Sequence, residues 1–305
     1  MAKSSVSRIA LRVVGVLVLI AMAMGAFYFW RPLTVNTAFN KLRMRMAGIE
    51  ENYADVGGTR VHYYAYGKGE PLVLVHGFSS DANLMVPLLV GMAPNFQVFA
   101  IDLLGYGDTD KPADGYSIAA QSKLVTDFIE AKKLGRTNLF GVSMGGWVAM
   151  HAAASRPELI DKLILANSSG VKFDLAFDPA VFFPQQPADI EKLRALMAPP
   201  APTPLPEFVN RDLVRMFKGM QDTNMKMMQS MGTGADLMDE RLGQITVPTL
   251  VYWGEPDKLV PLEVGQRLAA GIPGARLVTT PDCGHMAVLF CAGHFVPAAT
   301  GFLKE

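Results

Sequence analysis

Residues 138–150 read NLFGVSMGGWVAM, a strand-like apolar run that passes directly into a helix-like run. A G-x-S-x-G sequence at such a junction is typical of a nucleophile elbow, a sharp turn that holds a serine with its hydroxyl exposed. Glycine is needed at Gly141 and Gly145 because the turn leaves no room for side chains beside Ser143. The serine also precedes a helix, whose N-terminal partial charge favours a developing oxyanion. The motif therefore predicts that Ser143 is a nucleophile.

Short apolar runs alternate with helical patterns on both sides of this stretch. The strand-like runs are 61–66, 71–75, 97–101, 138–142, 162–166, 249–253 and 275–279. The helical runs are 84–92, 117–134, 144–155 and 263–271, with Ser117 as N-cap and Gly135 as the residue beyond a C-cap. Gly67-Lys68-Gly69-Glu70 predicts a hairpin between the first two strands. The alternation indicates an α/β fold with a mostly parallel sheet of about eight strands and helices on both faces.

The tetrapeptide His76-Gly77-Phe78-Ser79 follows the run 71–75. In an enzyme with a nucleophile elbow, the loop after this strand supplies one backbone N–H to the oxyanion hole. The residue that follows the nucleophile supplies the other. The predicted donors are therefore the amides of Phe78 and Met144. His76 could be mistaken for a base, but its place beside the oxyanion loop favours a structural role.

Two further turns supply the groups that a serine nucleophile needs. A base must take the hydroxyl proton, and a carboxylate must fix the tautomer of that base. Asp257 ends a Gly-Glu-Pro-Asp turn after the run 249–253, and His285 follows Cys283-Gly284 after the last strand-like run. The chain order Ser143, Asp257, His285 is the order found with nucleophile elbows, rather than that of chymotrypsin or subtilisin.

From about residue 57 to residue 303 the sequence resembles the α/β-hydrolases. The resemblance rests on the His-Gly-Phe loop, the DLLGYGD sequence at 102–108, GVSMGG, the RPE sequence at 156–158 and the two turns just described, in family order. It implies a serine hydrolase with a Ser143–His285–Asp257 triad, no cofactor and no metal. The N-terminal segment followed by this domain is similar to membrane-bound monoacylglycerol lipases and related bacterial esterases and lipases. That similarity implies cleavage of lipid esters, such as monoacylglycerols, through an acyl-enzyme.

Three alternatives stay open beside this interpretation. Asp102 is a second carboxylate candidate, although the resemblance gives it a structural position, and an aspartate nucleophile is disfavoured because Ser143 occupies the elbow. The same scaffold and triad also hydrolyse carbon–carbon bonds of ring-cleavage products. A non-catalytic, anchored ligand-binding protein is the third alternative, disfavoured because all three triad residues are present.

The region 168–247 departs from the strand–helix rhythm. It has no convincing core strand, and eight prolines fall between residues 179 and 206. Seven methionines crowd the remainder: Met216, Met220, Met225, Met227, Met228, Met231 and Met238. We expect a helical cap inserted over the edge of the sheet. Its methionines either line an adaptable apolar site or simply fill the core of the cap.

The run 13–30, VVGVLVLIAMAMGAFYFW, holds no charged residue. At ~1.5 Å per residue, a helix of this length approaches the ~30 Å hydrocarbon core of a bilayer. We expect a transmembrane anchor after a basic tail (1–12). A cleaved signal peptide is the alternative, disfavoured because the apolar run continues to Trp30. Basic residues flank both ends almost equally, and the N-terminus inside, with the domain outside or periplasmic, is the favoured orientation.

The segment 31–50 is expected to be a juxtamembrane linker, more a plain tether than an amphipathic helix. Residues 51–167 and 248–305 are expected to form the hydrolase core, and 168–247 the cap. Cys283 and Cys291 either pair, if the domain is exported, or remain separate buried thiols.

Composition excludes several classes of protein. Half of the 305 residues are hydrophobic and 18% are charged, which argues against disorder. The 28 basic residues balance the 28 acidic ones, so no overall field attracts nucleic acid. The expected partners are an apolar ester substrate and the bilayer, and no obligate protein partner is evident.

Overall fold

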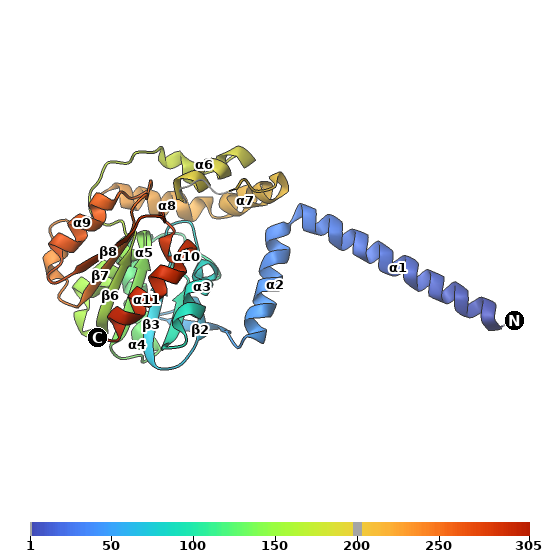
Figure 1. Cartoon of the computed structure of the whole chain (residues 1–305), viewed down its shortest axis with the longest axis horizontal. Coiled ribbons are helices and arrows are strands. Elements are labelled where there is room, and N and C mark those ends of the chain that lie inside the picture. Colours follow the sequence, from blue (N-terminus) through green and yellow to red (C-terminus); the bar gives the residue numbers. More distant parts are fainter. Residues whose placement is uncertain (1, 198–202) are drawn as a thin grey trace.

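The computed structural model describes residues 2–197 and 203–305. At its centre is an eight-stranded sheet with strand order β1-β2-β4-β3-β5-β6-β7-β8 (Figure 1). The strands are β1 (Glu50–Val56), β2 (Thr59–Tyr66), β3 (Glu70–Val75), β4 (Phe96–Ile101), β5 (Thr137–Val142), β6 (Ile160–Ala166), β7 (Thr249–Gly254) and β8 (Arg276–Thr280). β2 pairs antiparallel with β1 and β4, and every other neighbouring pair is parallel. The predicted mostly parallel sheet of eight strands is confirmed.

Helices cover both faces of the sheet and form two hydrophobic cores. The helices are α1 (Ala2–Trp30), α2 (Pro32–Met46), α3 (Ala82–Met92), α4 (Ile118–Ala131), α5 (Met144–Ser155), α6 (Pro187–Met197), α7 (Glu207–Gly219), α8 (Gln221–Gly232), α9 (Leu262–Gly271), α10 (Ala287–Phe290) and α11 (Ala292–Leu303). One core joins the sheet to α4, α5 and α9 through residues such as Phe128 and Leu268. The other joins it to α3 and α11 through Met85 and Phe295.

The predicted hairpin between 61–66 and 71–75 is wrong. β4 lies between β2 and β3, so those two strands do not pair. Gly67 is needed for another reason: a Cβ there would lie 2.3 Å from the carbonyl oxygen of Phe96, at the start of β4. The actual hairpin joins β1 to β2 through Gly57-Gly58, where both residues have positive φ. β1 was not predicted because its sequence, EENYADV, is polar, as suits an edge strand.

The two expected ends of α4 have different outcomes. Ser117 is the N-cap, and its side chain accepts a hydrogen bond from the Ala120 amide at 3.0 Å, as predicted. The helix ends at Ala131, however, and the left-handed residue that follows is Lys133 (φ 54°). The prediction of Gly135 as the residue just beyond the C-cap is therefore wrong; Gly135 has a positive φ later in the loop.

The cap helices α6, α7 and α8 lie between β6 and β7 in the chain and beside one end of the sheet in space (Figure 1). The described part of this segment, 167–197 and 203–248, contains no strand. The cap prediction is thus confirmed as a helical insertion. Its interior prolines 199, 200 and 202 lie outside the described residues.

The N-terminal region consists of two helices that meet at a sharp bend (Figure 1). α1 contains a 19-residue stretch, Arg12–Trp30, that is long and apolar enough to cross a membrane and is not buried against the protein. The expected tether at 31–50 is wrong, because α2 occupies most of it. Asp212 of α7 holds α2 in place. Its carboxylate accepts from the Leu33 amide at 2.9 Å and from Arg31 Nε at 3.1 Å, which caps the start of α2.

We predict that Asp212→Ala loosens α2 without unfolding the sheet. The substitution removes an N-terminal cap, an effect of ~1 kcal/mol in helices generally. Hydrogen exchange of the α2 amides should therefore quicken by about fivefold. Asp222→Ala is the matched control, because Asp222 is an exposed carboxylate paired with Lys226 on α8. Equal exchange in the two variants would contradict the role of Asp212.

Candidate functional site

The turn between β5 and α5 has the geometry of a nucleophile elbow. Ser143 adopts φ 55°, a left-handed conformation that is uncommon for a residue with a side chain. A Cβ at Gly141 would lie 2.2 Å from the carbonyl oxygen of Gly145, and one at Gly145 would lie 2.3 Å from that of Val75. The Ser143 amide donates to the carbonyl of Ala166 on β6 at 3.0 Å, which fixes the turn against the neighbouring strand.

Asp257 and His285 meet at the ends of β7 and β8. His285 Nδ1 lies 2.8 Å from Asp257 Oδ2, and both side chains are buried. The other carboxylate oxygen, Oδ1, accepts from the amides of Leu259 and Val260 at 2.8 and 2.9 Å. These amides fix the carboxylate, so that it accepts from Nδ1–H and leaves Nε2 as the free imidazole nitrogen.

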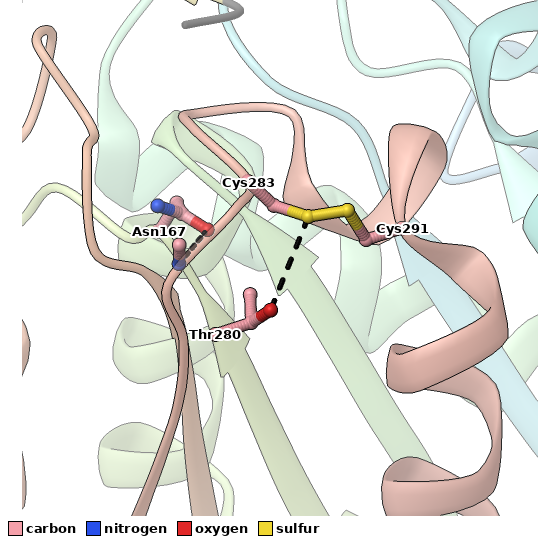
Figure 2. The surroundings of a disulfide bond; sticks show 5 residues. Asn167, Thr280, Cys283 and Cys291 are labelled. Atoms are coloured by element: carbon pink, nitrogen blue, oxygen red, sulfur yellow. Dashed lines mark hydrogen bonds between the residues drawn. A yellow bond between two sulfur atoms is a disulfide. The ribbon is translucent and has the colours of Figure 1, made fainter. Parts of the chain in front are cut away.

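Asn167 is a member of this cluster that the sequence analysis missed. Its side-chain amide donates to Asp257 Oδ2 at 2.7 Å. Its side-chain oxygen accepts from the Gly254 amide at 3.3 Å (Figure 2). The residue has a positive φ of 44°, which asparagine tolerates better than most residues. A signal was present in the sequence, because Asn167 is the first polar residue after the apolar run 162–166 and so lies at the end of a central strand.

A disulfide joins Cys283 to Cys291 and ties the loop that carries His285 to the start of α11 (Figure 2). This resolves the alternative between paired and separate thiols. The same loop lies against the end of β7, where a Cβ at Gly254 would be 1.8 Å from the Cys283 carbonyl oxygen. Backbone contact and disulfide thus hold the loop on two sides.

The amides of Phe78 and Met144 are free to bind an anion. Both residues line the same cavity as Ser143 and His285. Among the hydrogen bonds of the described residues, neither amide donates to a protein acceptor. Gly77 permits the close approach of the two loops, since a Cβ there would lie 3.2 Å from the Ser143 Cβ. The arrangement fits the predicted oxyanion hole.

His76 has a structural environment. Its Nδ1 lies 2.8 Å from the Gly77 carbonyl oxygen, and its Nε2 accepts from the Leu103 amide at 3.1 Å. Burial lowers the pKa of His76, which keeps the ring neutral. Both ring nitrogens are therefore occupied, and neither is left to act as a base.

Asp102, the second carboxylate candidate, likewise has a structural environment. It is buried, does not line the cavity and accepts from the Ala82 and Asp108 amides at 2.6 and 2.8 Å. His62 Nδ1 lies 2.7 Å from its Oδ2. Burial raises the pKa of Asp102, but hydrogen bonding from His62 and Ala82 outweighs it and holds that pKa below its usual range.

One group of side chains outside this site has ligand atoms within 4.8 Å of one another: Glu51, His62 and Asp108. Lys41 of α2 already contacts two of them, with Nζ 2.6 Å from the Glu51 carboxylate and 3.4 Å from that of Asp108. The ammonium group takes the place of a cation, so we assign no metal to this group.

The cavity above Ser143 has a volume of about 1770 Å³. Small-molecule sites generally occupy ~300–1,000 Å³, so this one has room for a large ligand. The two roles expected for the cap methionines, lining an apolar site or filling a core, are each taken by some of them. Of the seven methionines named above, four line the cavity: Met216, Met220, Met228 and Met231. Met227 and Met238 are instead fully buried in the core, and Met225 is exposed.

The cavity extends from Ser143 to the N-terminal helices. Aromatic rings of Phe78 and Phe182 meet edge to face within it, with centroids 5.2 Å apart. At its other end the lining includes Leu33, Thr37 and Lys41 of α2. The cavity is thus bounded by the sheet, the cap and α2 together.

Comparison with known proteins identifies hydrolases as the relatives of this chain. The sequence pattern described as the alpha/beta hydrolase family matches residues 72–296. A 2-hydroxy-6-oxo-6-(2'-aminophenyl)hexa-2,4-dienoic acid hydrolase of Metapseudomonas resinovorans is 27% identical, with 84% of this chain and 91% of the relative covered. A 2-hydroxy-6-oxononadienedioate/2-hydroxy-6-oxononatrienedioate hydrolase of Paraburkholderia xenovorans is 28% identical over 82% of this chain and 92% of its own.

A solved structure extends the similarity to the N-terminal helices. The crystal structure of a membrane phospholipase A, described as a bacterial virulence factor, aligns with a TM-score of 0.82 and 26% identity. The alignment covers 96% of this chain and 97% of the other. Residues 51–305 alone make up less than 96% of the chain. The aligned region therefore includes part of the segment that forms α1 and α2.

We predict a pH-dependent contribution of His62 to stability. Burial lowers the pKa of His62, but the hydrogen bond to Asp102 and nearby carboxylates outweigh it and raise the pKa. A raised pKa stabilises the fold below the unfolded value of ~6.5, and this contribution is lost as pH rises through the folded pKa.

His62→Asn should therefore lower the free energy of unfolding more at pH 6 than at pH 9, with a loss of ~1.5–3 kcal/mol at pH 6. Denaturant unfolding at both pH values measures the difference. His294→Asn, at an exposed position on α11, is the control and should show no such difference. A larger loss at pH 9 than at pH 6 would contradict the prediction.

Proposed function

The chain belongs to the alpha/beta hydrolase family, and on that premise we propose that it is a membrane-anchored serine hydrolase that cleaves carboxylic esters of lipids. Monoacylglycerols are the simplest members of that substrate class. One observation carries the proposal: Ser143 at a strained elbow, His285 paired with Asp257, and two free amides all face one large, mostly apolar cavity. Acyl transfer requires a nucleophile, a base with its carboxylate, and donors for the oxyanion, and these residues can supply all of them.

The mechanism follows from the arrangement. His285 Nε2 removes the proton from Ser143 Oγ, which attacks the ester carbonyl carbon. The amides of Phe78 and Met144 donate to the resulting oxyanion. His285 then protonates the leaving alcohol, and water repeats the cycle on the acyl-enzyme, while Asp257 stabilises the imidazolium. No step requires a cofactor or a metal.

Three features favour a lipid substrate at a membrane. α1 supplies a segment suited to span a bilayer. The cavity reaches α2, the helix that follows it, so the site lies near the proposed anchor. The membrane phospholipase A similar to this chain acts, by its name, on a lipid ester.

The Cys283–Cys291 disulfide favours an oxidising compartment, which supports a catalytic domain on the outer or periplasmic side.

Hydrolysis of a carbon–carbon bond is the second candidate. By their names, the relative from Metapseudomonas resinovorans is a hydrolase of a dienoic acid, and that from Paraburkholderia xenovorans is a hydrolase of a dienedioate and a trienedioate. Such substrates are small anions, whereas this cavity exceeds the usual size for a small ligand and is largely apolar. The size and the proposed anchor therefore favour a lipid ester.

We predict that Ser143→Ala abolishes both hydrolysis of monoacylglycerols and covalent labelling by a fluorophosphonate. Loss of the nucleophile should lower the rate by a factor on the order of 10⁶, as in a serine hydrolase whose triad serine is removed. Ser169→Ala is the control, because Ser169 lines the same cavity but is not part of the triad. Turnover of a dienoate without turnover of esters would favour the second candidate. Absence of labelling in the folded wild type would reject a serine hydrolase.

We further predict that Asn167 positions the acid of the triad. Asn167→Ala removes the hydrogen bond to Asp257 Oδ2, so the carboxylate orients His285 less well. The expected result is a fall in kcat of about tenfold, the effect of ~1.4 kcal/mol, with KM nearly unchanged. The conservative variant Asn167→Gln should recover part of the loss. An unchanged kcat, or a change in KM alone, would contradict a positioning role.

A further inference from the structure

The two sides of α2 have different surroundings. Leu33, Thr37 and Lys41 line the cavity, and Met44 packs against the core formed with α3 and α11. An apolar stripe lies on the other side of the helix, where residues recur at spacings of four, three and four. Its members are Val35, Phe39, Leu42 and Met46.

This α2 stripe is exposed to a degree that the rest of the fold does not explain. Phe39, Leu42 and Met46 are 58%, 55% and 81% exposed. Arg43 and Arg45 lie on its two sides, and the Arg43 guanidinium is 5.9 Å from the centre of the Phe39 ring. An apolar helix face with aromatic and aliphatic residues between basic ones is typical of a helix that lies in the membrane interface. The basic side chains can reach lipid phosphates while their stems cover apolar surface.

The direction of the α2 stripe agrees with this reading. Met44 contacts the body of the protein, and Leu42 and Met46, each two residues away from it, lie on a different side of the helix. Figure 1 shows α2 between the α/β body and α1. The stripe therefore faces the side to which α1 extends, and Arg31 is the single residue between α1 and α2.

We propose that the α2 stripe rests in the headgroup region of an anionic lipid bilayer. The inference rests on the membrane anchor of the proposed function and deepens it. Because the opposite side of α2 lines the cavity, contact with lipid would place the cavity next to the bilayer surface. The substrate class is then an ester presented by the bilayer, rather than one dissolved in water.

The first test measures depth in the full chain, reconstituted in vesicles of phosphatidylcholine and phosphatidylglycerol. Because Cys283 and Cys291 are paired, a nitroxide reagent labels an introduced thiol. The variants are Leu19→Cys in α1, Phe39→Cys in the stripe, and Asn40→Cys on another, exposed side of α2. Collision with oxygen, relative to a water-soluble nickel chelate, should be several-fold higher at Phe39 than at Asn40, and highest at Leu19.

The outcomes separate the inference from its premises. Nickel access at Leu19 would overturn the anchor and the inference with it. Equal nickel access at Phe39 and Asn40, with Leu19 shielded, would overturn the inference alone. Shielding of Phe39 combined with a short distance between labels on two chains would assign the stripe to a second copy, and would overturn it as well. The depth measurement uses no activity, so it does not depend on whether hydrolysis is found.

The second test compares two substrates. Phe39→Asp combined with Leu42→Asp should lower hydrolysis of a monoacylglycerol in these vesicles by a factor on the order of ten, since the apolar contact is lost. Turnover of a water-soluble short-chain ester should stay unchanged, because neither residue lines the cavity. Asn36→Asp combined with Asn40→Asp adds the same charge elsewhere on α2 and should leave both rates unchanged. Equal rates on vesicles for the two double variants would overturn the proposal.

Discussion

The closeness of three backbone segments around Ser143 is the constraint on which the site depends. Helix α5 starts so near to β5 and to the end of β3 that Gly141 and Gly145 cannot carry side chains. This contact forces Ser143 into its left-handed conformation and brings the Phe78 loop beside it. Ser143 and the two proposed oxyanion donors are thus placed by backbone packing at the centre of the sheet.

Asp257 and His285 are fixed in a different way. Asp257 is held by hydrogen bonds from two backbone amides, from Asn167 and from His285. The His285 loop is held by the end of β7 and by a disulfide to α11. The cavity depends on elements outside the sheet, namely the cap and α2, which are joined through Asp212. The fold therefore separates the proposed reacting groups from the surfaces that would select a substrate.

The sequence predicts the parts of this structure that depend on local patterns. Ser143 was identified because the elbow requires glycines at fixed spacing, and Asp257 and His285 because each follows a strand-like run in a known order. The strand pairing of β2 could not be predicted, since β4, from a later part of the chain, inserts between β2 and β3. The ordering of α2 likewise depends on Asp212, a residue distant in sequence. The roles of Ser143, Asp257, His285 and the two amides remain predictions. The Ser143→Ala variant tests the nucleophile, and the Asn167→Ala variant tests Asp257 through the hydrogen bond between them.

The insertion of the cap between β6 and β7 also separates, during synthesis, the appearance of Ser143 from that of Asp257 and His285. These strands are neighbours in the sheet, although the whole cap separates them in the chain. Loop-closure entropy rises only slowly with loop length, so such a long insertion is tolerated. During synthesis the strands up to β6 emerge first, and they include the serine turn; the strands that end near Asp257 and His285 emerge last. A nascent chain would therefore expose Ser143 before Asp257 and His285 are in place, so the proposed hydrolase activity would begin only when the C-terminal strands dock.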